Sequence, residues 1–394
     1  MTAEKKLPKP LLERAYLLLL ALASFEAFWG TTMIPAQPTR AMRLGLLALC
    51  ALVVALRLLF GEGRSPARLA AAAAVLALFA WDQWVLRGEQ WFLLELALFA
   101  VGARGVPFRK IVKTYLAATL PLLLVTMALS LSGAIENLVY LRRGVERYAF
   151  GICYPTDFCA HVFFLTACAV WLRAGKQRWI EIAMLPALAA FCMVFCEARN
   201  TVLCLCLLTA GLVYCKLRRS FAAKKGREYR MNGAVSALLA AAAPLLAAGM
   251  IALTLAYTPD SPWMQKLDAV FATRLSLGRE AFDSYPVPLL AQLVYMRGLG
   301  STHEYEGAYF WLDSSYINVL LRLGLPVLLL ALGVLVYCAL RQRKLGAWER
   351  LGLLAVIALQ CTVEHHLIEL AYHPFLLLAL AGDGEEPTAG EERL

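Results

Sequence analysis

The sequence predicts an all-α membrane protein, a polytopic bundle of about twelve transmembrane helices with a large, partly helical outer loop. Of its 394 residues, 61% are hydrophobic and 17% are charged, whereas soluble domains are about 45–50% apolar and about 25% charged. The apolar residues form runs of about 20, the length that an α-helix needs to cross a bilayer. This composition excludes a soluble enzyme, a disordered chain and a disulfide-rich secreted scaffold. A β-barrel would show short alternating segments instead.

Twelve apolar runs are candidates for membrane spans. They lie at about 15–34, 44–60, 68–86, 91–107, 112–133, 154–174, 179–197, 199–217, 233–257, 315–340, 350–366 and 368–381. The last two are short for two crossings, so a single span there, and eleven crossings in all, is the alternative. We expect one integral-membrane domain over residues 1–382, followed by an acidic tail at 383–394.

The distribution of lysine predicts the orientation, because cytoplasmic loops are enriched in basic residues. With a cytoplasmic N-terminus, ten of the eleven lysines lie inside, three of them in the basic run at 216–230. Both termini are then cytoplasmic, and the segments 134–153 and 258–314 lie outside. We interpret the basic run as a positive-inside loop that touches anionic lipid, and we expect no nucleic-acid partner.

The outer segment 258–314, between the ninth and tenth runs, has the pattern of a folded cap. Residues 262–284 predict one amphipathic helix, which Pro286 and Pro288 end. Residues 289–297 predict another short helix, stopped by Gly298 and Gly300.

Arginine, unlike lysine, gathers on the predicted outer side. Arginine binds phosphate or carboxylate through two parallel hydrogen bonds, so this excess indicates an anionic substrate on that face. The alternative is a set of snorkelling arginines on a solvated loop. All five histidines also map to the outer face or to outer helix ends. The residues concerned are Arg40, Arg43, Arg87, Arg142, Arg143, Arg147, Arg199, Arg274, Arg279, Arg297, His161, His303, His365, His366 and His373.

Several positions have both a functional and a structural interpretation. Arg199 follows Glu197 at a tight outer turn, where it binds a ligand or only pairs with Glu197. Asp313 precedes an apolar run together with Ser314, and it either caps a helix or acts as a carboxylate beside a sugar hydroxyl.

The spacing of His365, Glu369 and His373 would suit a metal only on a continuous helix, and we expect a turn there and no metal. The sequence lacks phosphate-binding and dinucleotide-binding glycine motifs, and it lacks the serine-hydrolase and zinc-protease motifs.

Four features together resemble the O-antigen polymerase and O-antigen ligase superfamily of bacterial envelope glycosyltransferases. They are the arginine in the turn FCEARNTVL, the late outer loop with an arginine-bearing helix, the segment DSSYINVLLRLG after a G-x-G turn, and FGICYPTDFCAH at 150–161. The resemblance covers roughly residues 145–380, whereas the first five spans match only in kind.

The resemblance implies a glycosyltransferase on the outer face of the bacterial cytoplasmic membrane. Such enzymes transfer a glycan from undecaprenyl diphosphate to an acceptor sugar, without nucleotide sugar, cofactor or metal. The partners implied are the lipid-linked donor and acceptor and the bilayer, with other polysaccharide-assembly proteins as further candidates. O-antigen, capsule or exopolysaccharide is the expected product.

The resemblance also suggests residue roles. Arg199 and Arg274 match arginines thought to hold the diphosphate, and Arg279 joins them as a candidate. The ligase branch has a histidine where this chain has Asp313, which favours the polymerase branch. Asp313 is then the candidate base and His303 the substitute. The accessory candidates are Arg147, Arg297, Tyr316 and His161.

Three other functions remain as alternatives. A ligase of the same superfamily would move finished glycan to lipid or protein. A transporter or flippase would show mid-membrane ionisable residues and duplicated halves, and the latter are not visible here. An intramembrane protease is a more remote possibility.

Overall fold

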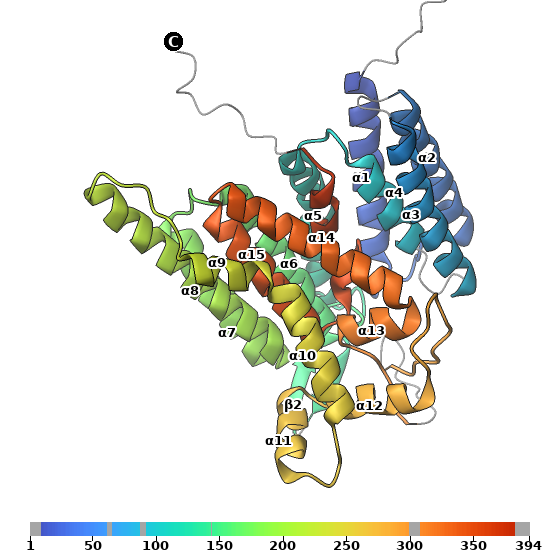
Figure 1. The fold of residues 1–394 in the computed structure, drawn as a ribbon. Coiled ribbons are helices and arrows are strands. Elements are labelled where there is room, and N and C mark those ends of the chain that lie inside the picture. The colour runs from blue at the N-terminus through green and yellow to red at the C-terminus, as the bar shows by residue number, and fades with distance from the viewer. Residues whose placement is uncertain (1–8, 61–64, 87–91, 143, 299–307, 383–394) are drawn as a thin grey trace, which may run out of the picture. The chain divides into compact units, whose positions relative to one another are not determined.

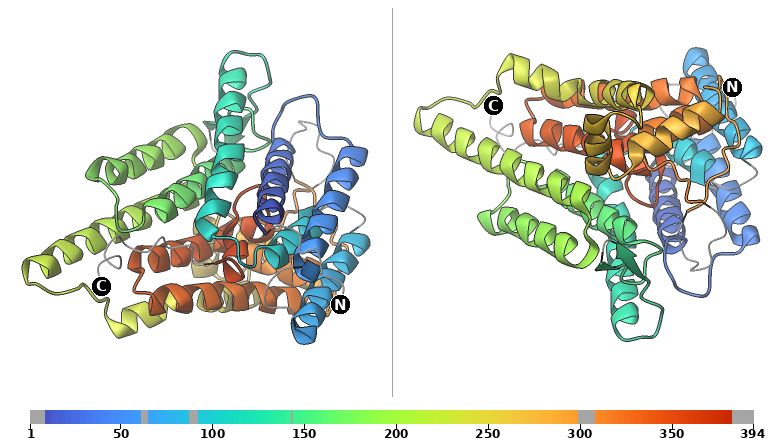
Figure 2. Two further views of the ribbon diagram at one scale, coloured as in Figure 1. Left: turned by 90° about the horizontal axis from the view of Figure 1, so that it is seen from above. Right: turned by 90° about the horizontal axis from the view of Figure 1, so that it is seen from below.

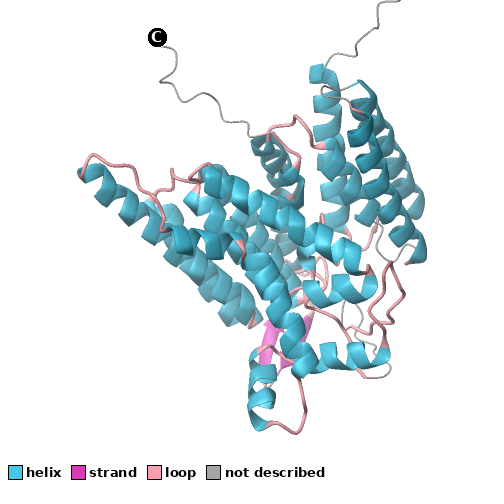
Figure 3. Cartoon of the chain, viewed as in Figure 1, coloured by secondary structure: helices cyan, strands magenta, loops and turns pink. Residues whose placement is uncertain are grey.

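The computed structural model describes residues 9–60, 65–86, 92–142, 144–298 and 308–382. These residues form fifteen α-helices, two short 3₁₀ helices and one two-stranded sheet (Figures 1 and 3). Seven helices are long and apolar enough to cross a membrane, or eight if a bent pair is counted as one span. The prediction of an all-α helical membrane protein is confirmed, whereas the described residues do not supply twelve such helices.

Short or charged segments explain the difference in number. Some apolar runs form helices that are too short to cross a bilayer: α4 (Phe92–Gly102) has 11 residues and α15 (Trp348–Val363) has 16. Residues 368–381 form turns and a 3₁₀ helix, η2 (Phe375–Ala379), in place of the predicted final span. The acidic tail at 383–394 lies outside the described residues.

The chain divides into two compact units. Unit 1 comprises Met1–Val125 and Glu369–Leu394, and unit 2 comprises Thr126–Ile368. In unit 1, the Tyr16 hydroxyl donates to the carbonyl of Phe99 at 2.8 Å, and the Phe108 amide donates to Gly382 at 3.1 Å. The helices of unit 1 are α1 (Lys9–Trp29), α2 (Arg40–Phe60), α3 (Pro66–Val85), α4 and most of α5 (Phe108–Leu131).

Unit 2 holds the site described below. Its helix α15 packs against α8, α10 and α14, and α7 and α8 lie side by side (Figure 2). Its elements are β1 (Val139–Arg142), β2 (Val145–Tyr148), α6 (Pro155–Arg173), α7 (Trp179–Cys196), α8 (Arg199–Lys224), α9 (Gly233–Ala240), α10 (Ala242–Ala256), α11 (Pro262–Val270), α12 (Arg274–Ser284), α13 (Ser315–Arg322), α14 (Leu325–Lys344), α15 and η1 (His366–Ile368).

Three predicted helices are broken or absent. The predicted helix over 262–284 is two helices, because Ala272 and Thr273 adopt left-handed φ values of 53° and 68°. The predicted helix over 289–297 does not form, and Arg297 instead exchanges backbone hydrogen bonds with Phe310. The run 315–340 is divided at Gly324, where φ is 90° and an added Cβ would lie 2.6 Å from the carbonyl oxygen of Leu289.

One further predicted span is bent where two helices meet. Helices α9 and α10 meet at Ala241 with a bend of 59°, so the run 233–257 forms a bent helix pair, either a broken span or a re-entrant segment.

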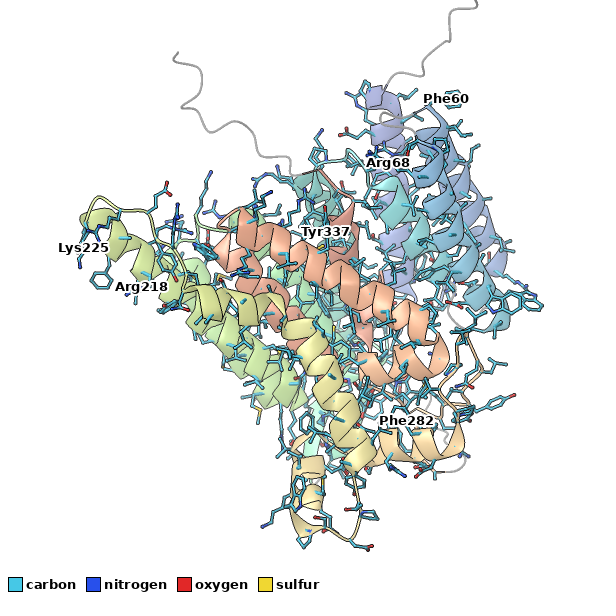
Figure 4. All side chains as sticks on the ribbon, viewed as in Figure 1. Phe60, Arg68, Arg218, Lys225, Phe282 and Tyr337 are labelled. Carbon is cyan, nitrogen blue, oxygen red and sulfur yellow. The ribbon has the colours of Figure 1, made fainter. Side chains whose placement is uncertain are left out.

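Basic turns come together at one end of unit 2. Arg219 in α8 pairs with Glu349 at 2.7 Å and donates to the Gly175 carbonyl at 3.0 Å. The Trp348 indole donates to the Tyr229 carbonyl at 3.1 Å. The α6–α7, α8–α9 and α14–α15 turns are thereby joined. Figure 4 shows Lys225, just after α8, and Phe282 of α12 toward opposite ends of this unit.

Candidate functional site

The site is built around Arg274, the first residue of α12. The left-handed residues before it end α11 and start a new helix. The carboxylate of Asp268 accepts hydrogen bonds from the Leu275 and Ser276 amides, at 2.9 and 3.1 Å. Asp268 thus takes the capping role that Thr273, the N-cap residue, does not fill with its own side chain. The break between α11 and α12 and this cap together fix where Arg274 lies.

Arg274 forms a buried ion pair with Asp313. The guanidinium nitrogen Nη2 lies 2.8 Å from Asp313 Oδ2, and the two side chains are only 13% and 10% exposed. Arg274 also donates to the backbone carbonyls of Ala272 at 2.7 Å and Val363 at 3.4 Å. Burial opposes the charge on Arg274, but Asp313 and Glu364 outweigh it and hold the pKa of Arg274 above its usual value.

Asp313 is not the N-cap of α13, whereas its interpretation as a carboxylate beside a sugar hydroxyl stays a prediction. Ser314 is the N-cap residue of α13, and within the described chain its hydroxyl makes no capping hydrogen bond. Asp313 lies outside the helix and binds Arg274, with the Tyr309 hydroxyl 3.4 Å from its Oδ2. Asp313 is therefore the partner of a buried cation.

Glu364 is a second carboxyl beside Arg274, and sequence reasoning missed it. It follows the last residue of α15, and its carbonyl accepts hydrogen bonds from the Ser315 amide and hydroxyl, at 3.2 and 2.6 Å. Its Oε2 is buried without a hydrogen-bond partner among the described residues. Burial raises the pKa of Glu364 to about 7, although Arg274 opposes this rise. The run Glu364-His365-His366 after an apolar helix was the available signal.

Two histidines adjoin the carboxylates. His365 Nδ1 lies 3.8 Å from Asp313 Oδ1, and His366 Nε2 lies 3.7 Å from Asp157 Oδ1. The two imidazole rings are 4.2 Å apart. Burial lowers the pKa of His366 to about 3, so this ring stays neutral across the physiological range. His161, an accessory candidate, is fully buried in α6 within electrostatic range of His366.

The β-hairpin adds two more arginines. Arg147 is 2% exposed and donates from Nε to the Cys196 carbonyl at 2.8 Å, with its guanidinium 5.5 Å from the Tyr154 ring centre. Its Nη2 finds no hydrogen-bond partner in the described part of the chain. Burial lowers the pKa of Arg142, and the nearby charges of Arg147 and Arg274 lower it further. Three arginines therefore share one electrostatic environment.

A small pocket opens at the ion pair. It encloses about 180 Å³, open solvent included, so the enclosed part is much smaller. This pocket therefore accommodates only part of a large substrate. Its lining residues are Arg274, Gly278, Trp311, Leu312, Asp313, Ser314 and Ile317.

Other predicted site residues form different contacts. Arg199 is 52% exposed and pairs with Glu197, which is the structural alternative for this residue. Arg279 pairs with Asp283 on the same helix at 2.9 Å. The Tyr316 hydroxyl donates to the Ala358 carbonyl at 2.7 Å in the core.

Two further candidates remain. Arg297 is exposed, and His303 lies outside the described residues. His365, Glu369 and His373 do not share one helix face, because α15 ends at Val363.

Comparisons of the chain with protein-family models, curated proteins and solved structures found no match.

Proposed function

We propose that the chain is a membrane glycosyltransferase that polymerises undecaprenyl-diphosphate-linked oligosaccharide repeat units on the outer face of the bacterial cytoplasmic membrane. The observation that carries this proposal is the buried Arg274–Asp313 pair at a pocket in a membrane helix bundle. The pocket lies away from the end of unit 2 where the basic turns meet, and that end is the cytoplasmic one by the positive-inside rule.

The chemistry of the leaving group suits this arrangement. Negative charge grows on the diphosphate as the glycosyl bond breaks, and preorganised donors in a water-poor site stabilise such charge. Arg274 is held in place by Asp313 and two carbonyls before any ligand arrives. Arg147 offers a nitrogen that no described group occupies. We assign the diphosphate to the Arg142, Arg147 and Arg274 cluster, with Arg199 further out at its pair with Glu197.

Because the pocket is small, three parts of the substrate lie in different places. The 180 Å³ includes open solvent, so the pocket takes only part of the junction between the first sugar and the phosphate. The remaining glycan then extends into solvent, and the prenyl chain lies along apolar helix faces in the bilayer. A polymerase needs this openness, because the growing glycan has no fixed length.

The test is an in vitro assay with purified protein and lipid-diphosphate oligosaccharide, in which polymerisation yields a ladder of products. Arg274→Lys should lower the rate by roughly 10²-fold or more, because a point charge cannot donate two parallel hydrogen bonds. Arg279→Lys is the matched control on the same helix and should keep near-normal activity, since Arg279 pairs with Asp283. A full ladder from Arg274→Lys would contradict the proposal.

Two alternatives predict different products from the same preparation. A ligase would transfer one glycan to a lipid or protein acceptor and give a single band. A transporter is favoured by one observation, the 59° bend between α9 and α10, because discontinuous spans form transport sites. In proteoliposomes a transporter would move labelled lipid-linked glycan between leaflets without breaking the glycosyl bond.

A further inference from the structure

We propose that His365 is the proton acceptor for the attacking hydroxyl and that Asp313 orients its imidazole. This inference rests on the proposed glycosyl transfer and names its base. It replaces the expectation that Asp313 is the base, with His303 as substitute.

The position of His365 supports this role. Its Nδ1 lies 3.8 Å from Asp313 Oδ1, and the Trp311 ring meets it edge-on at 5.9 Å between ring centres. His366 contacts it from another side at 4.2 Å. Asp313 and Trp311 both line the pocket, and the His365 side chain is 17% exposed. The imidazole thus lies behind two residues that line the pocket, without lining it itself, and part of its surface is exposed.

The two carboxyl groups nearby are poorer candidates. Asp313 Oδ2 already lies 2.8 Å from Nη2 of Arg274, so this carboxylate is occupied by a buried cation. The Glu364 side chain is buried, and burial favours its protonated form. A neutral imidazole accepts a proton near pH 7, because the reference pKa of histidine is about 6.5.

The proposed step conserves protons and charge. His365 begins neutral, with Nδ1–H directed at the Asp313 carboxylate. The acceptor hydroxyl oxygen forms a bond to the anomeric carbon of the donor, and its proton passes to His365 Nε2. The bond from that carbon to the diphosphate oxygen breaks, and the diphosphate leaves with the electron pair. The imidazolium then faces Asp313. The 3.8 Å separation exceeds a hydrogen bond, and such contacts commonly tighten when substrate binds.

The charged and titratable groups around His365 affect how the transfer rate depends on pH. Asp313 and His366 face His365 directly. Arg274 and Tyr309 face Asp313, and Asp157 faces His366. His366 keeps its charge constant above about pH 4, because its pKa is about 3. Glu364, with a pKa of about 7, titrates in the same range, so the contribution of His365 is the part of the acid limb that His365→Ala removes.

The experiment measures kcat/KM for glycan transfer from pH 5 to 9, with donor binding measured separately. His365→Ala should lower kcat/KM by roughly 10²–10⁴-fold and remove the part of the acid limb that His365 contributes. Added imidazole should restore activity at least tenfold, and donor binding should change less than about twofold. His373→Gln, in unit 1, is the histidine control and should keep the wild-type profile. Asp313→Asn, where it remains folded, should move the acid limb to lower pH, because the imidazolium loses its carboxylate.

The possible outcomes distinguish a wrong base assignment from a wrong proposed function. If the wild type transfers glycan while His365→Ala keeps its rate or the whole acid limb, the base assignment is wrong and the proposed function stands. An acid limb that Asp313→Asn leaves in place would remove the orienting role of Asp313. If the wild type releases no lipid diphosphate from any donor tested, the proposed function and the base assignment both fail.

Discussion

At the scale of single residues, the energetics of the site depend on a buried cation. Arg274 is 13% exposed and faces Asp313 directly. Neutralising either partner of a buried pair leaves the other charge uncompensated, at a cost of about 3–5 kcal/mol. Asp313→Asn should therefore destabilise the protein by more than the ~1 kcal/mol that the loss of a helix cap costs.

A double-mutant cycle tests this coupling. Arg274→Gln and Asp313→Asn should each lower the free energy of unfolding by about 3–5 kcal/mol, and the double variant should lose clearly less than the sum. The measurement is denaturant unfolding in detergent micelles. Additive losses would show that the two groups are energetically independent.

Glu364 predicts a pH dependence of stability. Its pKa is about 7 in the folded state and about 4.3 in an unfolded chain. The folded state binds the proton more tightly, so stability is fully present below about pH 4.3 and is lost as the pH rises through 7. The loss is about 4 kcal/mol at most.

The buried neutral His366 acts in the opposite sense, because its folded pKa of about 3 makes stability fall as the pH drops below about 6.5. The informative quantity is therefore the difference between wild type and Glu364→Gln at each pH. This difference should move in favour of the Gln variant between pH 5 and 7.5, whereas Glu280→Gln, on the exposed face of α12, should show no such trend. A difference that is constant with pH would contradict the raised pKa of Glu364.

At the scale of elements, Gly278 lets α12 pack closely against α10 and α13. A Cβ on Gly278 would lie 2.8 Å from Thr254 Cγ2 in α10 and 3.0 Å from Ile317 Cδ1 in α13. This close approach lets Arg274, one turn earlier, reach Asp313 beside α13.

Gly278→Ala should cost about 1–3 kcal/mol through overpacking and should reduce glycan transfer, because α12 has to move away. Adding Thr254→Ser removes the clashing methyl group and should recover much of both losses. Gly249→Ala in α10 is the control, since among the described residues no atom outside the adjacent backbone of its own helix lies within 4 Å of its added Cβ. Equal effects of Gly278→Ala and Gly249→Ala would argue against a role of Gly278 in the packing of α12. Unfolding midpoints and transfer rates provide the two readouts.

At the scale of the whole molecule, the orientation in the membrane is the testable property. Reporter fusions at positions 175, 222 and 345 should be cytoplasmic, because these turns are rich in lysine and arginine. Fusions at 145 and 285 should be external. An external reporter at 222 would place the arginine cluster inside and remove the basis for an external transferase.

The sequence by itself determined the class of protein and many of the chemical groups. Long apolar runs indicate helices, because backbone groups in lipid must be paired within the segment itself. Arg274 and Asp313 were identified from residue type and location. The breaks inside those runs were harder to predict, because the turn at Ala272 and Thr273 uses left-handed residues other than glycine, asparagine or aspartate.

Only the tertiary structure decided which of these groups act together. Arg274, Asp313 and Glu364 come from three segments far apart in the chain, and no local periodicity relates them. Their proximity depends on how α12, α13 and α15 pack, which side-chain shape at positions such as Gly278 controls. Arg199 shows the converse, because it finds a partner two residues away and remains exposed. Residue type predicts what a side chain can do, and packing determines what it faces.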